Sequence, residues 1–259
     1  MYNLYDIFSS TNIILFIAIM TRLMGVLVSA PLFSTFPIPQ QAKIWFSAIV
    51  AFILFPIIQS HSSFPTPTVV PELVVILLKE FLVGYAIGFC ANVVFIGMEM
   101  GANMFAIQMG LAADQALNPS SGGNSPVITQ AYTWLLTMTF IIVCAHHWLF
   151  SALYRSFSNI PIGYEFAFNS SIIEQIIVIS GQIFSVGLQI ALPIFGILLI
   201  TDILLGFTSK MMPQMNIFMV SIPLKVYLGL TLSLLFMKPI AIQSQVIIER
   251  LILQISTIF

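Results

Sequence analysis

Charged residues are the scarcest class in this chain. Asp, Glu, Lys and Arg together make up 7% of the sequence, whereas an ordinary soluble domain contains about 25%. Basic and acidic residues nearly cancel, which leaves a formal net charge of −1. There is neither a basic patch for nucleic acid nor an acidic tail. The composition therefore argues against a nucleic-acid-binding protein and, with 59% hydrophobic residues, indicates a membrane-associated one.

Cysteine is also rare. The two cysteines, Cys90 and Cys144, both lie in apolar runs, so a disulfide framework is not expected, and we predict that both are small buried hydrophobes. The first ten residues contain Asp6 but no Lys or Arg. A cleavable signal peptide needs a positive start, so we expect this segment to be retained.

The sequence lacks the motifs of enzymes. It contains no G-x-S-x-G elbow, G-x-G-x-x-G loop, P-loop or H-E-x-x-H helix, and its carboxylates are scattered over different segments. We expect no catalytic residues and no cofactor. His146 and His147 suggest a metal, but neighbouring helical residues point about 100° apart and no second ligand pair has zinc-site spacing. Packing or capping roles are favoured for both histidines.

Long apolar runs dominate what is present. Runs of about 18 residues can cross a bilayer as helices, and these lack the alternation of a transmembrane barrel strand. The sequence therefore predicts an all-α, hydrophobic, multi-helix membrane-associated protein that forms a single domain over residues 1–259. The runs lie at residues 13–30, 44–58, 73–98, 127–150, 172–205 and 217–237.

One apolar segment is too long for a simple span. Between Pro71 and Gly110 there is no further proline, and a continuous helix there would measure about 57 Å at about 1.5 Å per residue. The hydrocarbon layer is only about 30 Å thick. Either this helix is broken, or part of it lies outside lipid.

Six ionisable residues lie inside the apolar runs. Each would cost about 2.5–3.5 kcal/mol at a lipid-facing helix centre, so together they would offset roughly the whole stability of a domain. They must pair, line a water-filled lumen, or be buried against other subunits. These residues are Arg22, Lys79, Glu80, Glu99, Asp202 and Lys225.

Small residues and methionines mark possible packing sites. Gly84 and Gly88, and likewise Gly97 and Gly101, have the G-x-x-x-G spacing that lets helices approach closely. Methionines cluster at residues 98–104 and 211–219. They can fill gaps in a core or form a deformable lining around a passing chain, and the sequence leaves both open.

The most informative polar stretch is residues 112–126. Gly122 and Gly123, with Pro119 and Pro126 on either side, exclude a helix and favour a compact turn. It is either a surface connection or a loop in a lumen, because polar backbone at membrane depth is tolerated only against protein or water.

Taken in order, these residues resemble the FliR family of flagellar export-gate proteins over nearly the whole chain. Asn118 stands where members often carry Asp. Residues 146–148, Ser156, Phe157 and residues 160–163 are similar to the flagellar branch. The alternatives are the equivalent injectisome subunit and, less favoured because repeated halves are absent, a small secondary transporter. The matching residues are Arg22, Pro31, Phe33, Pro37, Lys43, Glu80, Gly84, Gly88, Gln108, Met109, Gly110, Pro119, Asp202, Gly206, Lys210, Pro213, Gln214, Asn216, Phe218, Pro223 and Lys225.

The resemblance implies a mechanism without covalent chemistry, metal or nucleic acid. FliR-like chains join FliP and FliQ as kinked helical hairpins in a helical hetero-oligomeric gate, largely raised out of the inner membrane, which passes unfolded flagellar proteins; FlhB meets them at the entrance. The segment matching residues 110–126 would plug the closed pore, with Gln108, Met109, Gly110, Asn118, Pro119, Gly122, Gly123 and Pro126. The implied assembly contacts are Arg22, Glu80, Gly84, Gly88, Asp202, Lys210, Pro213, Asn216 and Lys225.

Overall fold

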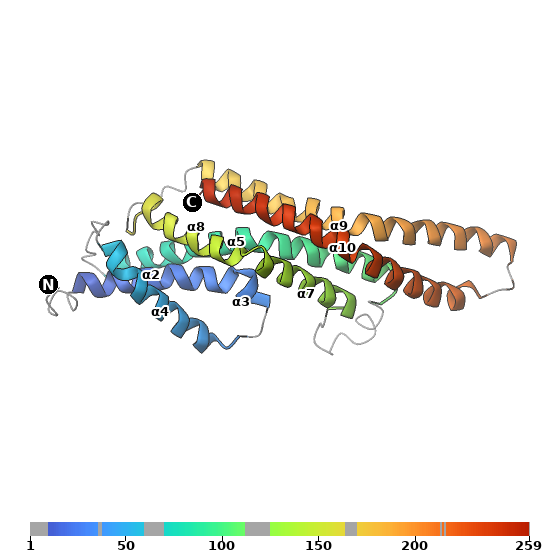
Figure 1. Ribbon diagram of the computed structural model, residues 1–259, viewed down its shortest axis with the longest axis horizontal. Helices are drawn as coiled ribbons and strands as arrows, with labels where there is room; N and C mark the ends of the chain where they lie inside the picture. Colours follow the sequence, from blue (N-terminus) through green and yellow to red (C-terminus); the bar gives the residue numbers. More distant parts are fainter. Residues whose placement is uncertain are drawn as a thin grey trace. The chain divides into compact units, whose positions relative to one another are not determined.

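The computed structural model describes residues 10–35, 38–59, 70–111, 125–163, 170–212, 214 and 216–258. Within these ranges the chain is helical and contains no strand, which confirms the all-α prediction (Figure 1). The helices are α2 (Ser10–Ser29), α3 (Pro31–Thr35), α4 (Gln40–Gln59), α5 (Val70–Gln108), α7 (Val127–Ile142), α8 (Ala145–Asn159), α9 (Ser170–Met211) and α10 (Ile217–Ile258).

The helices pack as two compact units. Unit 1 comprises residues 1–92, 144–180 and 249–259, and unit 2 comprises residues 93–143 and 181–248. Unit 1 therefore holds α2, α3, α4 and α8, and unit 2 holds α7, while α5, α9 and α10 each give one part to either unit. The single domain over residues 1–259 stays a prediction.

The helices fall into two length classes. Both α2 and α4 have 20 residues, which is about 30 Å of helix. By contrast, α5 has 39 residues and α9 and α10 have 42 each, about 58–63 Å. Because α5 is continuous from Val70 to Gln108, the alternative of a broken helix is wrong. Five of the described helices are long and apolar enough to cross a membrane, or six if α7 and α8 count as one span.

Prolines do not end these helices. Pro193 lies inside α9, and Pro223 and Pro239 lie inside α10. A proline removes one backbone hydrogen bond, but hydrophobic helices tolerate it where neighbouring groups satisfy the freed carbonyl. The predicted run that ended at residue 237 is therefore too short, because α10 continues to Ile258.

The predicted run over residues 127–150 is interrupted between α7 and α8. Cys144 precedes α8 with φ 56° and ψ 29°, a left-handed conformation that costs a residue with a Cβ atom about 1–2 kcal/mol. The Cys144 side chain is exposed, so the prediction that it is buried is wrong. Cys90 is fully buried, as predicted.

Candidate assembly and gating site

In unit 1, α2 and α5 cross at glycines. A Cβ atom on Gly25 would lie 2.7 Å from the Tyr85 nitrogen, and one on Gly88 would lie 2.8 Å from the Val26 oxygen. A Cβ atom on Gly84 would collide with the carbonyl oxygen of Arg22. Only glycine allows the two backbones to come this close, so the first G-x-x-x-G prediction is confirmed.

The same crossing holds a fully buried charge. Arg22 is 0% exposed, and its Nε donates to Glu80 Oε2 at 2.6 Å. Its other nitrogens donate to Ser156 Oγ at 3.2 Å and to the Ile160 carbonyl oxygen at 3.0 Å. The guanidinium also lies over the Phe157 ring, 4.3 Å from its centroid. One side chain therefore ties α2, α5 and the C-terminal end of α8 together.

This geometry locates four of the predicted assembly residues. Arg22, Glu80, Gly84 and Gly88 are all buried and contact other helices of this same chain. A replacement there would act on the fold of unit 1 before it could act on any partner. Their role in assembly stays a prediction.

In unit 2, the second glycine pair packs against α9. A Cβ atom on Gly97 would lie 2.9 Å from the Val186 Cβ atom, and one on Gly101 would lie 2.5 Å from the Gly187 carbonyl oxygen. This confirms that Gly97 and Gly101 also mark a helix contact. Gly181 differs, because it is exposed and an added Cβ atom there would meet nothing within 4 Å.

Asp202 organises the polar centre of unit 2. Gln108 Nε2 donates to Asp202 Oδ2 at 2.5 Å, and the Lys225 ammonium forms an ion pair with Asp202 Oδ1. The carboxylate thus links the last turn of α5 with α9 and α10. The pair is only partly buried, since the side chains of Lys225 and Asp202 are 18% and 35% exposed. Two of the six charges inside the apolar runs pair here and two more pair as Arg22 and Glu80.

The described ends of the predicted plug are fixed to unit 2. Met109 is fully buried, and its Cγ and Sδ atoms would lie 2.5 and 2.8 Å from a Cβ atom on Gly229. Gly110 follows with φ 85°. On the other side, Pro126 directly precedes α7, where Thr129 Oγ1 lies 2.8 Å from Asn103 Oδ1 of α5. Asn118, Pro119, Gly122 and Gly123 lie outside the described residues, as does Pro213.

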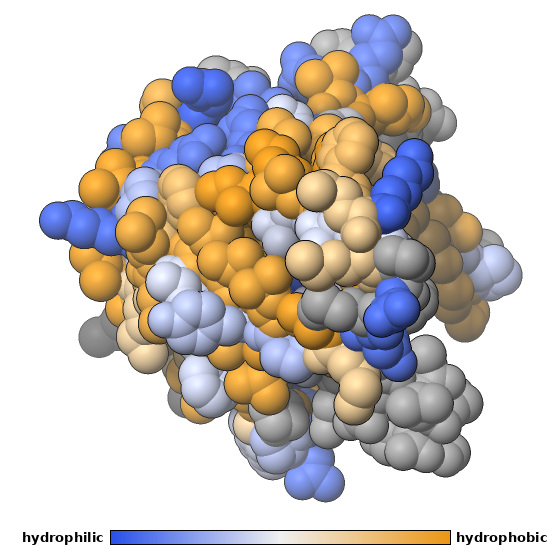
Figure 2. All heavy atoms as spheres, turned by 90° about the vertical axis from the view of Figure 1, so that its right-hand side faces the viewer, coloured by the Kyte–Doolittle hydropathy of each residue, from blue (hydrophilic) through white to orange (hydrophobic). Residues whose placement is uncertain are grey.

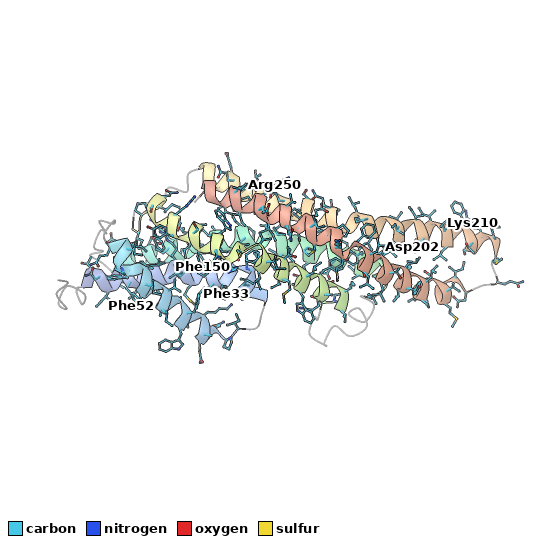
Figure 3. The ribbon with its side chains drawn as sticks, in the orientation of Figure 1. Phe33, Phe52, Phe150, Asp202, Lys210 and Arg250 are labelled. Carbon is cyan, nitrogen blue, oxygen red and sulfur yellow. The ribbon has the colours of Figure 1, made fainter. Side chains whose placement is uncertain are left out.

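Among the described residues of unit 2, the joined ends of α9 and α10 form a long stretch of exposed and half-buried side chains. Between Ile203 and Leu228 no described side chain is buried. Lys210, seen near the end of α9 with Asp202 in Figure 3, is exposed, and so is Asn216. Figure 2 shows a face on which apolar side chains predominate. The large exposed apolar residues of this stretch are Ile203, Leu204, Phe207, Met211, Met212, Met219, Val220, Ile222, Leu224 and Tyr227.

The contacts that sequence reasoning missed carry little local signal. Ser156 and Ile160 belong to the segment that resembles the flagellar branch, but nothing in the sequence connects them to Arg22, and only the fold brings them together. Gly229 could have been found, because a glycine inside an apolar helix often marks a close approach. The histidine rings of His146 and His147 lie 4.2 Å apart, and in the part of the chain that the structure describes no three His, Cys, Asp or Glu residues are placed to hold a metal.

Comparison with known proteins connects this arrangement to protein export. The chain is 28% identical over 220 residues to the flagellar biosynthetic protein FliR of Escherichia coli K12, covering 85% of this chain and 83% of that protein. It is 26% identical over 227 residues to the FliR of Bacillus subtilis 168, covering 87% and 86%. Residues 13–251 match the family described as Bacterial export proteins, family 1. Since this match takes in most of the chain, the protein belongs to the bacterial export proteins, family 1.

Proposed function

We propose that this chain is a structural, pore-forming subunit of the flagellar type III protein export gate. It assembles with FliP and FliQ in the bacterial inner membrane, and the assembly passes unfolded flagellar proteins, with FlhB at the entrance. The observation that carries the proposal is the exposed apolar surface at the joined ends of α9 and α10 in unit 2. No described side chain between Ile203 and Leu228 is buried there, and the ion pair of Asp202 with Lys225 is partly exposed.

This surface suits protein partners better than lipid alone. Contiguous apolar patches beyond a few hundred Å² generally mark an interaction site. Acyl chains could cover the apolar side chains, but Asp202 and Lys225 would be costly to expose to them. Helices of partner subunits can cover the same apolar side chains and also offer polar groups to the carboxylate. The named relatives are flagellar, which favours the flagellar gate over the injectisome subunit.

The proposed plug, residues 110–126, extends from two fixed points. Gln108 and Met109 hold its beginning through Asp202 and Gly229, and the contact between Asn103 and Thr129 holds its end. A segment fixed at both ends can close a lumen without being lost from it. In this proposal its movement during export is confined to the part between those anchors.

Co-expression with FliP and FliQ tests the proposal. We expect the three proteins to co-purify from the inner-membrane fraction as one complex. The variant Phe207→Lys, which places a charge on the bare end of α9, should reduce the yield of the complex while the chain itself still accumulates. Val70→Lys is the matched control, because Val70 is 74% exposed at the start of α5 and should leave the yield unchanged. A wild-type chain that does not co-purify with FliP and FliQ when all three proteins are expressed together would contradict the proposal.

A further inference from the structure

Two helices of unit 1 are as long as the hydrocarbon layer of a bilayer is thick. With 20 residues each, α2 and α4 measure about 30 Å, the thickness of the hydrocarbon layer. From this match and the surface of α4 we infer that the outer face of α4 binds phospholipid, with acyl chains along the helix and headgroup phosphates at Lys43. The inference rests on the membrane location in the proposed function and assigns the lipid contact to one helix.

Small and large side chains are sorted on opposite sides of α4. Ser47 and Ala51, one turn apart, are both 0% exposed, and the Ser47 hydroxyl donates to the Ile44 carbonyl oxygen at 2.8 Å. Helices in membranes use small residues for contact with other helices, and α4 has buried these within its own chain. Its outer face carries large apolar side chains, namely Trp45, Ile49, Phe52 and Ile53, exposed by 71%, 59%, 73% and 61%.

Other parts of the same chain cover one side of α4. The part of its surface that lipid could reach is correspondingly smaller. Phe46 lies 5.8 Å from Phe33 and 6.4 Å from Phe150, measured between ring centroids. On another side Phe16 of α2 lies 6.4 Å from Phe55. Phe52 does not take part in these contacts, and Figure 3 labels it on α4. Between Trp45 and Ile53 the exposed residues of the remaining face are all bulky.

Charged and amide side chains lie only at the two ends of α4. Lys43 and Trp45 stand near its beginning, the residue types that occupy the boundary between headgroups and acyl chains. At its other end Gln59 Nε2 donates to Asn12 Oδ1 of α2 at 3.1 Å. Between Ile44 and Ile58 no residue is charged, and the one hydroxyl, on Ser47, is satisfied within the helix.

The neighbouring helix α2 also has no exposed charge among its described residues. Arg22 of α2 is buried and paired with Glu80, whereas the exposed large side chains of α2 are Ile13, Ile17 and Val28. The described surface of α2 and α4 between their polar ends therefore presents apolar groups without a charge. This differs from the end of α9 and α10, where Asp202 stays 35% exposed. The uncharged surface of α2 and α4 therefore suits acyl chains, whereas the end of α9 and α10 suits a protein partner.

Photo-crosslinking distinguishes the two occupants. The assembled complex is reconstituted in vesicles of phosphatidylethanolamine and phosphatidylglycerol, with p-benzoylphenylalanine introduced singly at position 45, 52, 53 or 227. After irradiation we expect several-fold more phospholipid adduct at Phe52 and Ile53 than at Tyr227, a matched control that is 71% exposed on α10. Adducts at Trp45 should lie nearer the glycerol than those at Phe52, because Lys43 holds that end at the phosphates. Cross-links from position 52 or 53 to a partner subunit would overturn the inference. So would adducts at positions 45 and 52 that attach at the same distance from the glycerol of the lipid.

The same experiment on the chain without FliP and FliQ separates this inference from the proposed function. Lipid adducts at Phe52 should persist in that sample. If no complex forms but these adducts appear, the assembly proposal fails and the lipid surface stands. If the complex forms and Phe52 cross-links to a subunit, only the lipid inference fails.

Discussion

The side-chain amide of Gln108 donates a 2.5 Å hydrogen bond to Asp202. With the ion pair to Lys225, both carboxylate oxygens of Asp202 are engaged, one toward α5 and one toward α10. The carboxylate thereby fixes the point at which α5 ends and the proposed plug begins. Its importance is positional, since a partly exposed ion pair contributes little to stability.

Replacing Asp202 by Ala should loosen the end of α5 without unfolding the protein. Gln108 loses its acceptor, so amide hydrogen exchange at residues 108–111 should become faster, as measured by mass spectrometry on the solubilised chain. The free energy of unfolding should fall by less than about 1 kcal/mol. The charge exchange Asp202→Lys with Lys225→Asp restores the ion pair and should partly restore protection. Unchanged exchange in Asp202→Ala would show that the contact does not hold the helix end.

Replacing Glu80 by Ala should be far more damaging. Arg22 would stay fully buried without a counter-charge, which costs about 3–5 kcal/mol. Thermal unfolding of the detergent-solubilised chain should show a large loss of stability, and reduced assembly with partners would follow from it. Glu174→Ala is the control, because Glu174 is exposed on α9 in unit 1. Equal stability of the two variants would mean that the ion pair is not needed for the fold.

Two glycine substitutions should have opposite effects. Gly84→Ala brings a methyl group against the Arg22 backbone, so α2 and α5 must separate, at a cost of about 1–3 kcal/mol. Gly181→Ala meets nothing within 4 Å on an exposed helix position and should leave stability unchanged or raise it by up to about 1 kcal/mol. Comparing the two unfolding temperatures checks this, and a stable Gly84→Ala protein would disagree with the close crossing.

The two cysteines should react differently with maleimide. Cys144 is exposed and Cys90 is fully buried, and alkylation requires access to the thiol. Intact-mass measurement of the folded, solubilised chain should therefore find one adduct, and the denatured chain should give two. Assigning the first adduct to Cys90 would refute the packing of α5 described above.

Deleting residues 119–124 should make the export gate leak. The shortened segment could no longer fill a lumen, while its anchors at Gln108 and Thr129 would remain and the complex should still form. Ion conductance of reconstituted complexes should rise, with export partly retained. Replacing the same six residues by a Gly-Ser segment of equal length is the control. It keeps the length of the segment and changes only its sequence, so it separates the effect of length from that of sequence. Unchanged conductance in a correctly assembled deletion complex would defeat the plug hypothesis.

Sequence reasoning captured the features that depend on local pattern. The apolar runs predicted the helices, and the glycine spacings at Gly84 and Gly97 marked real helix contacts. Of the three alternatives for the charges inside the apolar runs, pairing is found for Arg22 with Glu80 and for Asp202 with Lys225. No local pattern named these partners, because contacts between distant segments depend on the fold.

The errors have physical causes too. Cys144 lies in an apolar run but occupies a left-handed turn between two helices, which composition does not reveal. A helix break, one of the two alternatives for residues 71–110, does not occur because no residue there stops a helix. A helix longer than the bilayer is thick does not for that reason end. For α10, the apolar run ends before Lys238, but the helix continues past that residue and past Pro239 to Ile258.

The ion pair of Arg22 also sets an order of events during synthesis. Glu80 follows Arg22 by 58 residues and Ser156 by 134. At a translation rate of about 5–20 residues per second these partners emerge roughly 3–12 s and 7–27 s after Arg22. Until Glu80 and Ser156 have both been made, the guanidinium must stay in water or at the insertion machinery. The helix α2 therefore cannot reach its packed position by itself. Unit 1 therefore closes only once α8 has been made, and its first helix is among the last to reach its final surroundings.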